Sequence, residues 1–250
     1  MKFRTTRPFG SAWRAAAACL LLAAFMTLLT GCLYPEDKLQ QNMPPKEAVR
    51  NVQAAVDQYF QELGLLPIAN SGQEVPRYEK FKVDYKKLTG KGYLSSIPTS
   101  AFENGGNYYF LIIDEETEPR VKLMDIVTSQ KINDIQNWVK GHLESRGELP
   151  KAGEMYPGFY SIDYDSMGRK APDIPSVFSG TLISAIMDDN GVVYADYGID
   201  LMQLMSRDNS LQADEQTDLR EWLVDASDFV PVKSPVYRLQ DGEPVAVQPE

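Results

Sequence analysis

Residues 132–150, INDIQNWVKGHLESRGELP, decide the fold, because they repeat residues 49–67, VRNVQAAVDQYFQELGLLP, at a constant offset of 83 positions. In both stretches apolar residues recur at steps of three and four, the spacing of one face of an α-helix. A glycine follows each stretch and favours the helix end, and a proline stands three residues beyond it. The chain therefore contains two copies of one amphipathic helix, predicted over residues 46–63 and 130–146.

The duplication extends beyond the two helices. Residues 78–85 resemble residues 156–164, because a tyrosine, a phenylalanine and an Asp-Tyr pair recur in the same order. Further along, Ile97-Pro98 lines up with Ile174-Pro175. We interpret the whole as a tandem duplication of roughly 75 to 80 residues per copy.

Each copy ends in two β-prone runs separated by a turn. In the second copy the turn contains Asn190-Gly191, the strongest short-range hairpin signal, and we expect positive φ at both residues. The paired strands are predicted at 108–113 with 120–124, and at 181–187 with 192–197. Each copy is therefore predicted to lay one helix across a small antiparallel sheet, which gives an α+β fold class.

The rest of the chain is predicted to form a smaller element. Residues 201–205 either extend the second hairpin or begin a short helix, residues 214–224 read as an acidic helix, and Asp241-Gly242 separates the strands of a further hairpin. Five segments follow from these patterns: a lipoprotein signal peptide (1–31), a lipidated tether (32–45), a first α+β repeat (46–128), a second α+β repeat (129–208) and a C-terminal helix and hairpin (209–250).

The N-terminal segment carries the pattern that a lipoprotein signal peptidase reads. A basic stretch precedes an apolar run at 15–29, and the run closes on Leu29-Thr30-Gly31-Cys32. The run is shorter than the roughly 20 apolar residues that span a bilayer, and it ends without a basic stop-transfer cluster. We therefore predict cleavage before Cys32 and lipidation of that residue.

Charge and cysteine usage exclude several functions. Removing the signal peptide with its four basic residues changes the net charge from −10 to −14, which argues against nucleic acid or an anionic lipid surface as partner. Cys19 leaves with the signal and Cys32 is acylated, so no cysteine remains for a disulfide, a thiolate metal site or a nucleophile. With His142 as the only histidine, a multi-histidine metal cluster is excluded.

Candidate chemical groups are few. Asp163-Tyr-Asp165-Ser-Met-Gly168 opens like a calcium loop, but Ile174 stands where an EF-hand has its closing glutamate. We therefore expect the Asp-Tyr pair to serve a structural turn or a cross-strand hydrogen bond. His142 could act as a general base. It aligns with Tyr59 on the packing face of the first helix, however, which favours a partly buried structural imidazole.

Acidic pairs could supply the carboxylates of a glycosidase. Both Glu115-Glu116 and Asp188-Asp189 are predicted in hairpin turns, where solvated side chains are expected, whereas catalytic acids need burial to raise the pKa. The sequence also lacks a Gly-x-Ser-x-Gly elbow and a phosphate-binding loop. We predict no catalytic residue, metal or cofactor, and expect binding residues on the long connections 67–77 and 168–179.

The lipobox, the Asp-Tyr pairs and the Asn-Gly hairpin together resemble uncharacterised lipoproteins of Gram-positive spore-forming bacilli. This resemblance implies a thioether-linked diacylglycerol on Cys32. The first helix running into Gly64-Leu-Leu-Pro67, with Gly92-Tyr93-Leu94 and Ile97-Pro98 further on, is similar to the globular opening of pilins and pseudopilins. That similarity implies a helix laid on a sheet.

These observations predict a membrane-tethered lipoprotein on the extracytoplasmic face of the cell membrane. We expect a non-enzymatic binding or interaction module of the cell envelope, with an envelope protein or a wall-associated ligand as partner. Two alternatives stay open: an enzyme that acts on envelope glycans through carboxylates, and a pseudopilin-like assembly component.

Overall fold

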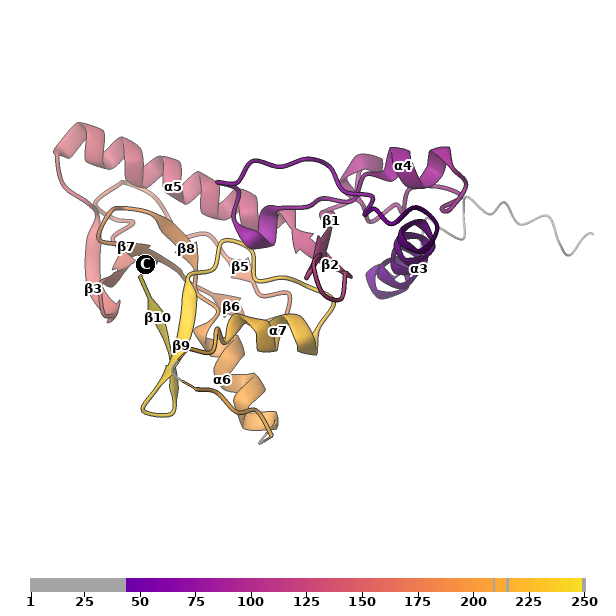
Figure 1. The fold of residues 1–250 in the computed structure, drawn as a ribbon. Coiled ribbons are helices and arrows are strands. Elements are labelled where there is room, and N and C mark those ends of the chain that lie inside the picture. The colour runs from indigo at the N-terminus through magenta and orange to yellow at the C-terminus, as the bar shows by residue number, and fades with distance from the viewer. Residues whose placement is uncertain (1–43, 209, 215, 249–250) are drawn as a thin grey trace, which may run out of the picture. The chain divides into compact units, whose positions relative to one another are not determined.

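The computed structural model of the protein describes residues 44–208, 210–214 and 216–248. These residues form one compact unit of helices and small antiparallel sheets (Figure 1), which confirms the predicted α+β class. The predicted signal peptide, Cys32 and all but the last two residues of the predicted tether lie outside the described residues. Within the described ranges, none of the helices combines the length and apolar character needed to cross a membrane.

The first copy contains helix α3 (Pro45–Leu63), the short helix α4 (Tyr85–Gly90) and the hairpin of β1 (Tyr108–Ile113) and β2 (Arg120–Asp125). Two 3-10 turns, Arg77–Glu79 and Phe102–Asn104, lie in its connections. Helix α3 ends at Gly64, whose φ of 66° is a left-handed cap and whose N–H donates to the carbonyl of Phe60. Its predicted apolar face packs on the hairpin, with Val52 and Val56 fully buried.

The second copy contains helix α5 (Ile126–Arg146) and a four-stranded sheet of order β3-β4-β7-β8. Its strands are β3 (Lys151–Tyr156), β4 (Phe159–Ile162), β7 (Ala185–Asp188) and β8 (Val193–Ala195). A small separate pair consists of β5 (Ile174–Pro175) and β6 (Leu182–Ile183). Figure 1 shows α5 along β7 and β8, the same helix-on-sheet arrangement as in the first copy.

Helix α5 begins four residues earlier than the predicted Gln130. The reason is Asp125, the last residue of β2, whose carboxylate accepts hydrogen bonds from the backbone N–H groups of Val127 (3.2 Å) and Thr128 (3.0 Å). A carboxylate in this position caps the free N–H groups of the first helical turn. The hairpin of the first copy therefore runs into the helix of the second without a linker.

Matched backbone contacts support the duplication. In the first copy Ile68 pairs with Val83. In the second copy Lys151, which stands 83 positions after Ile68, pairs with Ile162. The segment around Lys82 then lies beside β1, as β4 lies beside β7. The sheet order of the second copy is thus repeated in the first by short bridges.

Two glutamines at the repeat offset make the same pair of hydrogen bonds. Gln53 on α3 donates to the carbonyl of Pro119 (3.0 Å) and accepts from the N–H of Val121 (2.6 Å). Gln136 on α5 donates to the carbonyl of Gly191 (2.7 Å) and accepts from the N–H of Val193 (2.9 Å). Each helix is therefore fixed to its hairpin at an equivalent point.

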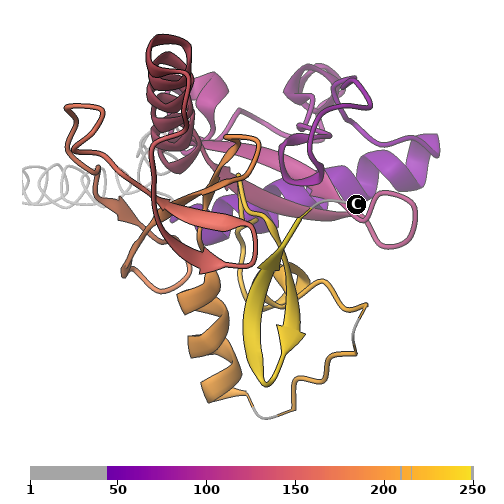
Figure 2. The same ribbon diagram turned by 90° about the vertical axis from the view of Figure 1, so that its left-hand side faces the viewer.

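The C-terminal element contains α6 (Gly198–Arg207), α7 (Arg220–Ala226) and the hairpin of β9 (Val236–Gln240) and β10 (Glu243–Val247). Helix α6 packs against α7 and β10, as Figure 2 shows. The prediction of a helix from residue 214 is wrong, because Asp214 forms a turn instead: its carboxylate accepts from the N–H of Gln216 and the hydroxyl of Thr217.

Turn geometry also differs from the prediction at Asn190-Gly191. Only Gly191 has positive φ (81°), and the connection is longer than two residues, since the N–H of Asp188 donates to the carbonyl of Val192. Asp188 shapes this loop, because its buried carboxylate accepts from the N–H groups of Asn190 and Val192 at 2.9 and 2.8 Å. The two-residue turn with positive φ at both positions forms at Asp241-Gly242 instead.

One C-terminal segment joins the sheets of the two copies. Beside β2, the N–H of Leu123 donates to the carbonyl of Asp228 (2.8 Å), and the N–H of Val230 donates to the carbonyl of Leu123 (2.9 Å). Beside β8, the N–H of Ala195 donates to the carbonyl of Lys233 (2.8 Å). The two copies are therefore parts of one body.

Candidate functional site

The clearest difference between the two copies is the covering of the helix. In the first copy α4 follows the Asp-Tyr pair and buries Leu88 completely against the α3 side of the core. Tyr93 follows α4, and its ring stacks edge-on against Tyr59 with centroids 5.4 Å apart. Its hydroxyl donates to Glu62 at 2.6 Å. This face of α3 is therefore closed.

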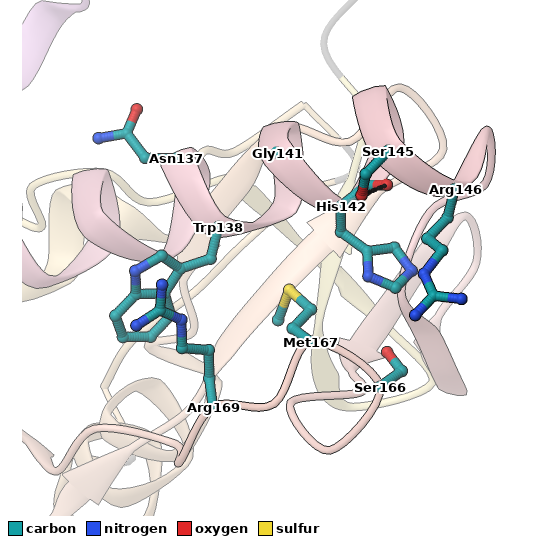
Figure 3. A pocket seen from close by; sticks show the side chains of 9 residues that line it. All are labelled: Asn137, Trp138, Gly141, His142, Ser145, Arg146, Ser166, Met167 and Arg169. Carbon is teal, nitrogen blue, oxygen red and sulfur yellow. Dashed lines mark hydrogen bonds between the residues drawn. The ribbon is translucent and has the colours of Figure 1, made fainter.

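In the second copy a tight turn replaces α4. The Asp163 carboxylate accepts from the N–H of Ser166 (3.1 Å), and the Asp163 carbonyl accepts from the Ser166 hydroxyl (2.8 Å). The turn is too short to cover the helix above it, so the last turns of α5 border a hollow of about 330 Å³ (Figure 3). It is lined by Asn137, Trp138, Gly141, His142, Ser145, Arg146, Ser166, Met167 and Arg169.

A second hollow of about 330 Å³ adjoins the first, because both are lined by His142, Arg146 and Ser166. The second continues toward the start of β3, where Glu148, Lys151 and Asp163 contribute charged groups. We call the two connected hollows the α5 groove.

Two guanidinium groups dominate the first hollow. Arg169 lies over the ring of Trp138, with its central carbon 5.2 Å from the ring centroid, and Figure 3 shows the two groups face to face. Arg146 projects from the end of α5 at the other side of the hollow (Figure 3). Neither arginine has an ion-pair partner among the described residues, whereas Lys151 in the second hollow pairs with Asp189 at 2.7 Å.

His142 is half-buried in a wall of the groove, and Figure 3 shows its imidazole directed toward Met167 and Arg146. Its counterpart Tyr59 is buried in the core of the first copy. The Ser145 hydroxyl donates to the backbone carbonyl of His142 (3.1 Å), so this bond does not link the hydroxyl to the imidazole. The arrangement supplies donors and a titratable ring, without a nucleophile held on a base.

Of the two Asp-Tyr pairs, only the one at Asp163 forms a turn, one of its two predicted roles, whereas Asp84 begins a helix. The Asp84 carboxylate caps α4 by accepting from the N–H of Lys86 (3.1 Å), and Asp163 holds the turn beneath the groove. No cluster of three or more His, Cys, Asp or Glu side chains that could hold a metal ion occurs in the part of the chain that the structure describes.

The two acidic pairs differ from each other. In the loop between β1 and β2, Glu116 is exposed, as predicted, whereas Glu115 is half-buried. Asp188 is only 2 % exposed, so the predicted solvated position is wrong for this residue. Its burial follows from its role as acceptor for the loop N–H groups, while its neighbour Asp189 is exposed and binds Lys151.

Both predicted binding connections border cavities. The connection 168–179 supplies Arg169 to the α5 groove, and its Phe178 and Ser179 line a smaller cavity of about 110 Å³ beside Asp200. The connection 67–77 supplies Pro76 and Arg77 to a cavity of about 360 Å³. There Arg77 is bound to Asp114 and Glu221, and Lys233 is bound to Glu79, so those cations are neutralised locally.

Sequence reasoning identified His142 and Arg169's connection but missed the groove that contains them. A sequence difference that could have predicted the groove is visible in the aligned helices, where Trp138, Ser145 and Arg146 replace Ala55, Glu62 and Leu63. These changes remove an acidic and an apolar side chain from one helix face and add a basic one. The groove thus lies on a helix face where the second copy differs in chemistry from the first.

Comparison with known proteins relates part of the chain to a protein family. No curated protein and no solved structure matches the chain. Residues 45–125 match the family model of the YphF family N-terminal domain. The match runs from the first residue of α3 to the last residue of β2, so the chain is similar to this family over its first copy.

Proposed function

We propose that the protein is a lipoprotein of the cell envelope, tethered to the extracytoplasmic face of the cell membrane through Cys32. In this proposal it is a non-enzymatic module that binds an envelope protein or a wall-associated ligand in the α5 groove. The lipobox supports the location. The uncovered face of α5 supports the binding role, because the same face is closed in the first copy and the fold does not require it to be open.

The chemistry of the groove favours binding over catalysis. A glycan-cleaving enzyme needs two carboxylates that converge on one bond, one of them with a raised pKa. The first hollow has no carboxylate in its lining. The second has two, but Glu148 is exposed and the Asp163 carboxylate is engaged in its own turn. Tryptophan and arginine, which meet in the first hollow, are among the residues enriched at the centres of binding surfaces.

Site-specific photo-crosslinking in intact cells tests this proposal. A photoreactive side chain at Ser145 or Ser166 stands in the groove. The matched control is Lys140, which is exposed on the same helix, pairs with Glu144 at 3.9 Å and does not line the groove. We expect both groove positions to capture the same identified protein or wall polymer, and Lys140 to capture neither.

The result also separates this proposal from its alternatives. Equal capture at Lys140 and at the groove positions, or no capture anywhere in cells that display the protein, contradicts a binding role for the groove. Turnover of a glycan by the purified protein that survives replacement of Arg146 and Arg169 supports an enzyme whose site lies elsewhere.

A further inference from the structure

We infer that the ligand of the α5 groove is an anionic glycan: a sugar polymer with phosphate or carboxylate substituents, one of which binds between Arg169 and Arg146. This inference rests on the proposed function and names the ligand class for the same site. The protein as a whole is acidic, with a net charge of −10 over the full sequence, so an anionic ligand needs a locally basic surface.

The first hollow provides that surface. Its charged lining consists of Arg146 and Arg169, with the imidazole of His142 between Met167 and Arg146, and no acidic side chain contributes to it. In the first copy the position of Ser145 holds Glu62, which is engaged by Tyr93. The second copy has therefore lost an acid and gained Arg146 on the same helix face, and both changes favour an oxyanion.

Stacking makes Arg169 a directional binder. With one face on Trp138, the guanidinium keeps the N–H groups along its edge in one plane and available to a ligand. A planar fork of this kind matches the two oxygens of a carboxylate or phosphate, which a lysine ammonium cannot do. Trp138 is in this respect a positioning residue that acts through Arg169.

The second hollow explains why the ligand is a glycan and not a free anion. Lys151 offers N–H donors there, while Glu148 and Asp163 offer acceptors. With Arg146, which lines both hollows, the positive and negative side chains of this hollow are equal in number. Hydroxyl groups both donate and accept, so a polyhydroxylated chain suits this part of the groove. The connection between the hollows allows one ligand to occupy both.

The same features argue against an acidic protein as the ligand. Protein interfaces usually depend on an aromatic or arginine anchor that fills a desolvated pocket. The ring of Trp138 is covered by Arg169, so the aromatic face that could receive a partner's side chain is already occupied. What remains accessible in the first hollow is mostly polar, with Met167 as its apolar side chain.

The test measures direct binding to the full-length lipidated protein in uncharged phospholipid nanodiscs. The probes are oligogalacturonate for a carboxylate glycan, phosphorylated dextran for a phosphate glycan, unmodified dextran as the neutral glycan and polyglutamate as the anion without sugar rings. We expect binding of one or both anionic glycans, weakened by high salt because exposed charge pairs are screened. The affinities for neutral dextran and for polyglutamate should be lower by about tenfold or more.

Variants connect binding to the groove. Arg169→Lys and Arg169→Gln should each weaken binding about tenfold, the usual scale of a lost charged hydrogen bond. Trp138→Leu should also weaken binding, although it leaves both arginines of the groove in place. Lys140→Gln removes one positive charge outside the groove and should change the affinity little. If Arg169→Lys binds as tightly as the wild type while Arg169→Gln does not, the positive charge alone suffices. That result would contradict the directional role of the guanidinium.

Three outcomes overturn the inference: equal affinity for neutral and anionic dextran, polyglutamate binding as tightly as the glycans, or anionic-glycan binding that Arg169→Gln and Trp138→Leu leave unchanged. Each of these is compatible with groove crosslinking to a neutral polymer or a protein, in which case the proposed binding function stands. Loss of all groove-specific crosslinking contradicts the proposed function itself.

Discussion

Asp200, on the first turn of α6, is the residue whose burial has the clearest pH consequence. It is 3 % exposed, its Oδ2 accepts from the Ser176 hydroxyl at 2.9 Å, and its Oδ1 has no hydrogen-bond partner among the described residues. Burial raises the pKa of Asp200, while the hydroxyls of Ser179 and Ser176 lower it in part.

A pKa raised in the folded state means that the folded protein binds the proton more tightly than the unfolded chain. The free energy of unfolding therefore falls as pH rises from the unfolded pKa of about 3.9 through the higher folded value. We predict that Asp200→Asn, which removes the charge and keeps an acceptor for Ser176, stabilises the protein by roughly 1 kcal/mol at neutral pH. Urea unfolding at neutral and acidic pH measures this.

The stabilisation should shrink below the unfolded pKa, because the carboxyl is then neutral in both states. A variant that is less stable than the wild type at neutral pH, or whose difference from it is the same at every pH, contradicts the buried-charge explanation. Asp189→Asn, at an exposed position in an ion pair, is a control expected to change stability little.

At the scale of the element, the hydrogen bonds that join a helix to its hairpin can be tested at Gln136. Its amide bonds both the Gly191 carbonyl and the Val193 N–H, so replacement by leucine leaves two backbone groups without partners in a partly buried place. We predict a loss of about 1 to 3 kcal/mol in the free energy of unfolding for Gln136→Leu. Chemical denaturation of the variant measures it.

The chain offers a matched pair of controls. Gln53→Leu removes the equivalent contacts in the first copy and should cost a similar amount, whereas Asp134→Ala changes an exposed residue of α5. If Gln53→Leu and Gln136→Leu cost no more than Asp134→Ala, the glutamines do not fix the helices to the hairpins.

The elements that sequence patterns predicted are those set by local chemistry. Helix ends at Gly64 and Gly147 follow from their left-handed conformation, and the apolar stripe of α3 follows from its period. The start of α5 was missed because its cap, Asp125, belongs to a β-strand. The start of α7 was missed because Asp214 bonds to its neighbours in a turn instead of beginning a helix.

The site was less predictable because it depends on contacts between distant segments. The repeat showed His142 at a helix position that is buried in the first copy. Whether that face is covered depends on the segment after Asp163, which forms a turn here and a helix in the first copy. Likewise, the carboxylate of Asp188 is buried because it organises a loop, which charge alone does not reveal.

At the scale of the whole molecule, the segment 227–233 makes the two copies one folding unit. It supplies backbone partners to Leu123 in β2 and to Ala195 in β8, and Lys122 donates to the carbonyls of Val224 and Ser227. We predict that the amides of Leu123 and Ala195 exchange with solvent deuterium with similar free energies of opening, close to that of global unfolding. Hydrogen exchange followed by NMR measures both.

Removing residues 227–250 should then lower the protection of both amides together. This is expected although Leu123 contacts the segment at Asp228 and Ala195 contacts it at Lys233. Unequal protection in the intact protein, or loss at Ala195 with Leu123 unaffected in the shortened chain, indicates two independently unfolding copies.

The last prediction concerns the lipid tether, which lies outside the described residues. Helix α3 begins at Pro45, so the twelve positions from 33 to 44 separate Cys32 from the folded unit and span at most about 40 Å. Two acyl chains hold a protein to a membrane stably. Among the described residues, no helix is long and apolar enough to span the bilayer in their place.

We predict that Cys32→Ala prevents processing and acylation at this site, so that detergent phase partitioning and fatty-acid labelling distinguish the variant from the wild type. A Cys19→Ala variant, which changes the other cysteine inside the signal, should be labelled and processed normally. If Cys32→Ala is cleaved at the same position and partitions as firmly into detergent as the wild type, the anchor is not a lipid on Cys32, and the envelope location must then rest on another attachment.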